Sequence, residues 1–204
     1  MKSFAVLFLA ALAFGCATTP KVQASLATAH VVQDFSSYSL RRVGLVPFGG
    51  VALEPEQAEA LQATLSNALS EAVGFEIVML SDFDLEEIPR AEPSRKGWVK
   101  PDTVLAIARR YNLDGIFVGT VTQLQSYTPQ KLGLSVDLVA AETGLSVWTA
   151  SVELDASQAR VQEAIHAWYV QSRASQPGAE GEDIYLLSPR RFAEFACAQI
   201  ARML

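Results

Sequence analysis

The chain has few of the residue types that build metal centres and nucleophilic active sites. Its 204 residues include only two cysteines and two histidines, and His30 and His166 both stand without a second metal-ligating residue at a suitable spacing. The sequence also has no G-x-S-x-G motif and no glycine-rich phosphate loop. Carboxylates occur, but none forms a recognisable acid–base pair. We therefore predict no catalytic residues, no metal and no cofactor.

Basic residues are also scarce. The chain has 16 Lys and Arg against 22 Asp and Glu, a formal net charge of −6 at pH 7. Proteins that bind nucleic acid need a clustered positive surface, and no basic cluster with interleaved aromatic residues occurs here. We expect no nucleic-acid partner.

The N-terminal apolar run is too short to span a bilayer. It covers the eleven residues Phe4–Phe14 and follows a single charge at Lys2, whereas a membrane-spanning helix needs about 20 residues. A short apolar run behind a positive charge is typical of a signal peptide. We assign residues 1–15 to this segment.

One of the two cysteines lies directly behind this run, in the stretch AFGCATTP. The arrangement resembles the lipobox of bacterial lipoproteins, although Ala13 stands where that family prefers Leu. The resemblance implies cleavage before Cys16, acylation of its sulfur, and anchoring to the lipid bilayer by several acyl chains, which bind far more stably than one. Because Ala17 rather than Asp follows the cysteine, it also implies the outer membrane, on the periplasmic face. The alternative is an ordinary signal peptide or a core segment that happens to contain a cysteine.

The remaining chain divides into a tether and one domain. Residues 16–40 are rich in Ser, Thr and Ala without a sustained period, which predicts a lipidated tether with a short strand over Ala29–Val32. Residues 41–204 carry regular apolar patterns and form a single domain. Lipidation would leave Cys197 without an intramolecular partner, and we expect it to be a small buried hydrophobic residue.

Apolar spacing predicts the elements of this domain. Short apolar runs predict strands over Val43–Phe48, Phe75–Leu80 and Ile116–Val121, the last covered on both faces. Alternation around a Gly-ending turn predicts an antiparallel hairpin over Leu132–Leu154, with Trp148 facing inward. Apolar stripes at spacings of three and four predict helices that start at Pro55, after a cap at Asp102, near residue 157 and at Pro189 after a Ser188 cap. This order predicts an α/β fold with helices against a mixed sheet.

Two irregular segments carry aromatic residues outside any apolar stripe. They are residues 82–100, which contain Trp98, and residues 126–131, which contain Tyr127. Large rigid aromatic side chains contribute most per residue at protein interfaces, so we predict Trp98 and Tyr127 as partner contacts; the alternative is that they cover the core or the sheet edge. The acidic residues of the first segment (Asp82, Asp84, Glu86 and Glu87) lack the glycine and the later Glu of a Ca²⁺ loop, which favours a solvated surface.

Three longer stretches suggest a family. They are VGLVPFGG, ARRYNLDGIFVGTVTQLQSYTPQKLGLSVDLVAAETGLSVW and LSPRRFAEFACAQIA. Together they resemble the CsgG-related periplasmic lipoproteins, which include curli-secretion subunits, lipoprotein activators of peptidoglycan synthases, flagellar-envelope lipoproteins and, more distantly, the TolB N-terminal domain. The most specific parts are Asp114–Val121 and Thr143–Trp148. The resemblance covers residues 41–204 and implies an α/β fold similar to anticodon-binding domains.

These observations favour a non-catalytic outer-membrane lipoprotein that binds another envelope protein. One alternative is a subunit of an oligomeric secretion channel of the curli type. Such channels need strands of about 9–11 alternating residues for a membrane barrel, and the one candidate pair, Leu132–Leu154, is needed to complete the domain sheet. The other alternative is a hydrolase whose site has no recognisable motif. The partner and the oligomeric state stay open.

Overall fold

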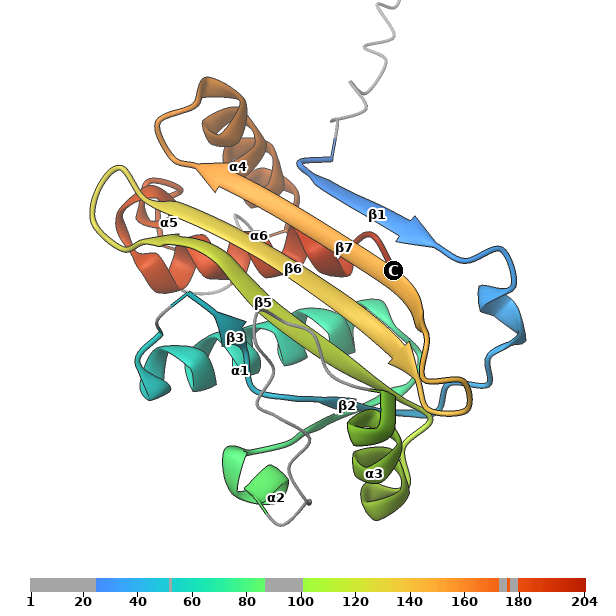
Figure 1. Ribbon diagram of the computed structural model, residues 1–204. Coiled ribbons are helices and arrows are strands. Elements are labelled where there is room, and N and C mark those ends of the chain that lie inside the picture. Colours follow the sequence, from blue (N-terminus) through green and yellow to red (C-terminus); the bar gives the residue numbers. More distant parts are fainter. Residues whose placement is uncertain (1–24, 52, 87–100, 173–175, 177–179) are drawn as a thin grey trace, which may run out of the picture.

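The computed structural model describes residues 25–51, 53–86, 101–172, 176 and 180–204. It confirms the α/β class: a mixed seven-stranded sheet packs against helices (Figure 1). The strands are β1 (Ala27–Val31), β2 (Arg42–Leu45), β3 (Gly49–Gly50), β4 (Glu76–Met79), β5 (Gly115–Gln125), β6 (Lys131–Ala140) and β7 (Ser146–Asp155). The helices are α1 (Pro55–Ala72), α2 (Asp82–Glu86), α3 (Pro101–Tyr111), α4 (Ala159–Ser172), α5 (Ile184–Leu187) and α6 (Pro189–Ala201), and a 3-10 turn covers Phe35–Ser37.

The sheet combines a parallel and an antiparallel part. Its strand order is β1-β7-β6-β5-β2-β4, and the short β3 also pairs with β5. Strand β2 runs parallel to β4 and β5, whereas β5, β6, β7 and β1 pair antiparallel in turn. The predicted hairpin is confirmed as β6–β7, with Leu138 opposite Trp148. Its turn contains Gly144 at a φ of 68°, a backbone conformation that favours glycine.

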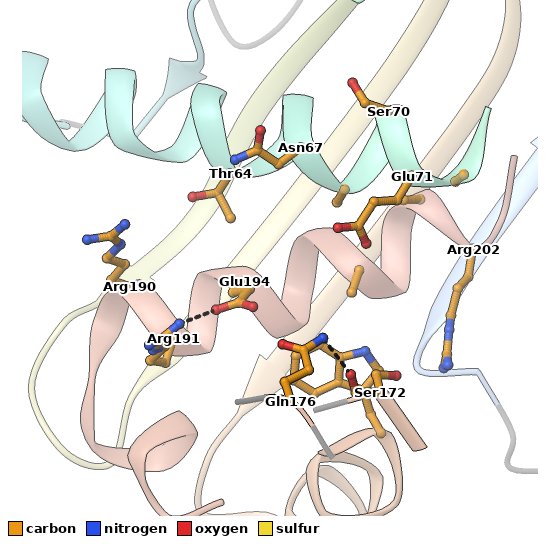
Figure 2. Close-up of a pocket in the computed structure, with 15 residues that line it drawn as sticks. Thr64, Asn67, Ser70, Glu71, Ser172, Gln176, Arg190, Arg191, Glu194 and Arg202 are labelled. Carbon is orange, nitrogen blue, oxygen red and sulfur yellow. Dashed lines mark hydrogen bonds and ion pairs between the residues drawn. The ribbon is translucent and has the colours of Figure 1, made fainter. Parts of the chain in front are cut away.

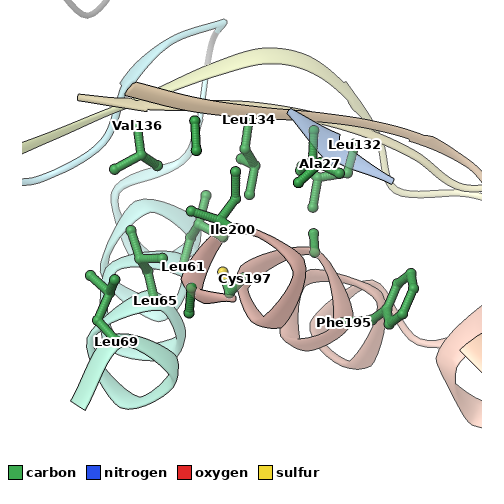
Figure 3. Close-up of a cluster of buried hydrophobic side chains, with 14 of the residues drawn as sticks. Ala27, Leu61, Leu65, Leu69, Leu132, Leu134, Val136, Phe195, Cys197 and Ile200 are labelled. Carbon is green, nitrogen blue, oxygen red and sulfur yellow. The ribbon is translucent and has the colours of Figure 1, made fainter. Parts of the chain in front are cut away.

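Helices cover both faces of the sheet, as the buried central strand predicts. On one face α1 and α6 form the larger core, in which their apolar stripes meet β6 (Figure 3). Its labelled members include Leu61, Leu65, Leu69, Leu132, Leu134, Val136, Cys197 and Ile200. On the other face α3 packs Val104 and Ile107 against Ile116 and Val118 of β5. No helix within the described ranges is long and apolar enough to cross a membrane.

The predicted starts of α1 and α6 are confirmed. Pro55 is the first helical residue of α1, whose start is closed by reciprocal hydrogen bonds between Glu54 and Gln57. Ser188 caps α6, and its side chain accepts a hydrogen bond from the Arg191 backbone N–H at 3.5 Å. The predicted cap at Asp102 is wrong, because α3 begins one residue earlier at Pro101 and Asp102 lies in its first turn.

The sheet begins inside the range that the sequence assigns to a tether. Strand β1 pairs with β7 along its whole length, from Ala27 opposite Val152 to Val31 opposite Trp148. Of its five residues only Ala27 is buried. Its small apolar residues alternate with Thr28 and His30 over five positions only, and four of the five are exposed, which is why the pattern indicates only a short strand there. The division into signal peptide, tether and domain stays a prediction.

Trp148 and Cys197 are both buried, as predicted. Trp148 is 1% exposed, its ring meets Phe117 edge to face, and its Nε1–H donates to the carbonyl oxygen of Met203 at 3.0 Å. Cys197 is fully buried with a free thiol, and burial raises the pKa of that thiol. The Cys197 side chain therefore acts as a small hydrophobic group within the core.

A buried amide joins helix α1 to the sheet, and we expect its removal to be costly. Gln62 is 6% exposed, and its Nε2 donates to the carbonyl oxygens of Leu45 at 2.7 Å and Leu80 at 2.8 Å. The change Gln62→Leu leaves the Leu80 carbonyl buried without this donor, so we expect the free energy of unfolding to fall by about 1–3 kcal/mol in denaturant titrations. The control Glu59→Leu, on the exposed side of the same helix, should change it by less than about 0.5 kcal/mol. Equal stability of the two variants would contradict this role.

Candidate functional site

One of the three residues predicted as sites lies in the part of the chain that the structure describes. Cys16 and Trp98 lie outside it. Tyr127 lies in the connection between β5 and β6, with its side chain 74% exposed. Gln125 closes this connection, because its Nε2 donates to the carbonyl oxygen of Pro129 at 2.5 Å. The Tyr127 ring is therefore presented to solvent from an ordered turn, the position that a partner contact requires.

The acidic segment after β4 begins with a short helix. Ser81 and Asp84 close the start of α2 together: the Asp84 carboxylate accepts from the Ser81 hydroxyl at 2.6 Å and from its backbone N–H at 2.8 Å. These hydrogen bonds hold the pKa of Asp84 below its ordinary value, and the bond from the Ser81 hydroxyl has the largest effect. Asp84 thus serves as a helix cap. Within the described ranges, no three His, Cys, Asp or Glu residues are placed to hold a metal ion.

A polar groove of about 850 Å³ runs between α1, α4 and α6 (Figure 2). Small side chains of α1 and α6 line it, namely Ala68, Ala72, Ala198 and Ala201. Polar and charged side chains surround them, including Thr64, Asn67, Glu71, Arg190, Arg191, Glu194 and Arg202. The groove is open to solvent and offers both guanidinium donors and carboxylate acceptors to a bound molecule.

The arginines of the groove differ in their surroundings. Arg191 donates from Nη2 to Glu180 at 2.7 Å and from Nη1 to Glu194 at 3.0 Å. These two carboxylates raise the pKa of the Arg191 guanidinium, and Glu194 has the larger effect. Arg191 is therefore held in place before any partner arrives. The side chains of Arg190 and Arg202 form no hydrogen bond or ion pair with another residue in the described ranges. Their positive charges are available at the mouth of the groove.

A second cavity is smaller and apolar. It measures about 300 Å³ and lies where the first turns of α1 and α6 meet the β5–β6 hairpin. Its apolar lining includes Leu53, Leu61, Leu124, Leu132 and Phe192, and its polar lining includes Gln57, Lys131 and Arg190. Lys131 pairs with Asp155 at 2.9 Å, and Arg190 lines this cavity as well as the groove. The sequence did not predict the polar groove or the apolar cavity, because each forms only where segments far apart in the chain meet.

The similarities found for this chain are to solved structures. No known family matches it, and no curated protein does. Among solved structures, the PelC dodecamer from Paraburkholderia phytofirmans superposes with a TM-score of 0.51 at 12% identity, over 86% of this chain and 94% of that one. The chain shares the PelC fold. A single-substitution variant of PelC gives a TM-score of 0.50 at 12% identity, over 87% and 96% of the two chains.

A further similar structure is lipoprotein GNA1162 from Neisseria meningitidis. It matches with a TM-score of 0.44 at 17% identity, over 67% of this chain and 99% of that one. At 12% identity, the comparison with PelC establishes the fold of the domain alone. The narrower resemblance to CsgG-related lipoproteins stays a prediction.

Proposed function

We propose that this protein is an outer-membrane-anchored, periplasm-facing lipoprotein that acts as a non-catalytic interaction module for another envelope protein. The observation that carries the proposal is the position of Cys16, directly behind an eleven-residue apolar run and followed at once by the turn-prone stretch Ala17–Pro20, which contains two threonines. This pattern supplies an anchor at one end of the chain. The folded domain then supplies the binding surface at the other end.

The surface of the domain supports a protein partner. Tyr127 stands exposed on an ordered turn, and Arg191 is held by two carboxylates at the edge of the polar groove. Tyrosine and arginine are both enriched among the residues that dominate binding energy at interfaces. A side chain that is already ordered loses less conformational entropy on binding, which favours affinity.

A second candidate is a subunit of an oligomeric assembly, such as a secretion channel of the curli type. The observation that favours it is the shared fold with PelC, whose solved structure is a dodecamer. At 12% identity the likeness concerns the fold, so the assembly of PelC is a motive for testing this chain rather than a property transferred to it.

Alanine variants of the two predicted aromatic contacts test the first candidate. Tyr127→Ala and Trp98→Ala should each weaken capture of an envelope partner in a cross-linking pull-down by roughly tenfold or more, the effect expected of an interface hot spot. Because the Tyr127 ring is 74% exposed, its variant should unfold as cooperatively as the wild type. The matched control is Leu145→Ala, an apolar residue of similar exposure (63%) in the other hairpin turn.

Two outcomes of this experiment would count against the assignment. Normal capture by both variants would place the interaction surface elsewhere on the domain. Loss of cooperative unfolding in both would show that the rings stabilise the fold.

A further inference from the structure

Helix α2 presents an aromatic ring to solvent between two carboxylates. The segment reads Asp82-Phe83-Asp84, and Phe83 is 72% exposed. Met79, at the end of the edge strand β4 and four residues earlier, is 53% exposed. Exposed large apolar residues that gather near one another mark interaction surfaces more often than isolated ones do. The Phe83 ring is therefore a candidate anchor for a protein contact.

The apolar cavity between α1, α6 and the β5–β6 hairpin is a suitable receptor for such a ring. A closed apolar cavity of about 150 Å³ is enough to bind benzene, and this one measures about 300 Å³. Its apolar lining comes from aliphatic side chains and Phe192. Aromatic pairs gain additional stabilisation in edge-to-face or offset arrangements. A phenyl ring that entered the cavity would find both the space and an aromatic neighbour.

The cavity lining carries two basic side chains, Lys131 and Arg190, against one acidic side chain, Glu56, so a basic group is present that an acidic residue beside the ring can pair with. Arg190 lines the cavity and has no ion-pair partner among the residues that the structure describes. Asp82 is exposed and is likewise unpaired within those residues, whereas Asp84 is used by Ser81 and Tyr111. Opposite charges that meet at an interface steer the encounter and fix its register. The Asp82 carboxylate adjacent to Phe83 thus matches the guanidinium at the cavity.

We propose that the Phe83 ring of one copy of this chain occupies the apolar cavity of a second copy, with Asp82 of the first paired to Arg190 of the second. The two surfaces lie apart on one molecule: Figure 1 shows α2 beyond β2 at the lower end, and the β5–β6 connection at the opposite, upper left. The contact is therefore head-to-tail. Each copy keeps one free ring and one free cavity, so association repeats until a ring closes or a filament grows.

This inference rests on the second candidate function, an oligomeric assembly, and names the contact that would join its copies. It does not depend on the first candidate, because it would hold whether or not Cys16 is acylated or Tyr127 contacts a partner. A failure of the pull-down described above would leave it intact, and its own failure would leave the proposed lipoprotein role intact.

Measurement of the assembled mass of the full chain in non-ionic detergent tests the proposal. The wild type should form assemblies larger than one 22.1 kDa chain in light scattering and sedimentation, with the detergent contribution subtracted. Phe83→Ala and Arg190→Asp should each shift the protein to monomer, and both should keep the circular dichroism of the wild type because the two side chains are exposed. Leu145→Ala, a control of similar exposure to Phe83, should assemble as the wild type does.

Two combinations make the test specific for this pair of surfaces. The double variant Asp82→Arg with Arg190→Asp restores opposite charges and should recover the assembly. Ala193→Trp fills the cavity from α6 and leaves Phe83 in place. A mixture of Phe83→Ala with Ala193→Trp should therefore stop at a heterodimer, because one intact ring meets one intact cavity. A monomeric wild type, an unchanged assembly in Phe83→Ala, or a double variant that stays monomeric would overturn the proposal.

Discussion

Replacement of Trp148 by alanine should lower the free energy of unfolding by about 3–5 kcal/mol, the range for removal of a buried tryptophan from a core. Trp148 is 1% exposed and contacts the Phe117 ring at a centroid distance of 6.0 Å. Its indole N–H also ties β7 to the C-terminal end of the chain through Met203, at 3.0 Å. The variant therefore loses core volume, an aromatic contact and a hydrogen bond that joins two parts of the fold.

Denaturant titration followed by circular dichroism measures this loss. Domains of this size are stable by about 5–15 kcal/mol, so the expected change is a large fraction of the total and should lower the melting temperature clearly. Val170→Ala, at a position 54% exposed on α4, provides a control that should stay within about 0.5 kcal/mol of the wild type. An unchanged melting temperature for Trp148→Ala would mean that β7 presents its other face to the core.

The change Cys16→Ser should abolish lipid labelling and move the protein from the membrane to the soluble fraction. The apolar run Phe4–Phe14 has eleven residues and is too short to hold the chain across a bilayer without the acyl chains. Metabolic labelling with a fatty acid, followed by fractionation, measures both effects. Cys197→Ala removes the other cysteine and should leave the labelling unchanged, because that thiol is fully buried. A Cys16→Ser protein that stayed on the membrane after alkaline washing would refute the lipoprotein assignment.

Long elements with a complete apolar pattern could be predicted from the sequence. Helices α1 and α6 carry both an apolar stripe and a start signal, at Pro55 and at Ser188 with Pro189, and the sheet gives each stripe a partner. The strands of the β6–β7 hairpin have ten residues each, and apolar residues alternate with small or polar ones over Leu132–Leu138 and Trp148–Leu154. In these elements the local pattern and the tertiary packing favour the same structure, so the prediction holds.

Short elements and those at the sheet edge could not be predicted in this way. Helices α2 and α5 have five and four residues, too few to repeat a stripe. Strand β1 buries only Ala27, so its backbone pairing with β7 leaves almost no trace in the side-chain pattern.

In the candidate site too, some features could be predicted from the sequence and others could not. The exposure of Tyr127 agrees with its place in an irregular segment rich in turn residues. Neither cavity could be predicted, because Arg190 approaches Thr64 only once α1 and α6 have packed side by side. One local signal was present: Arg190 and Arg191 stand in the first turn of α6, where the helix dipole disfavours cations. Such a conflict with a local rule indicates a functional or paired charge.

Under the proposed anchoring at Cys16, the pairing of β1 with β7 would set how far the domain can move from the bilayer. If the acyl chains lie on Cys16, the chain between this residue and the start of the sheet at Ala27 is eleven residues long, and eleven residues at full extension span at most roughly 36–40 Å. A tether that continued to residue 40 would span at most roughly 80–86 Å. If Cys16 is the anchor, the first strand would therefore halve the distance that the domain can reach, and a partner would have to lie close to the membrane surface.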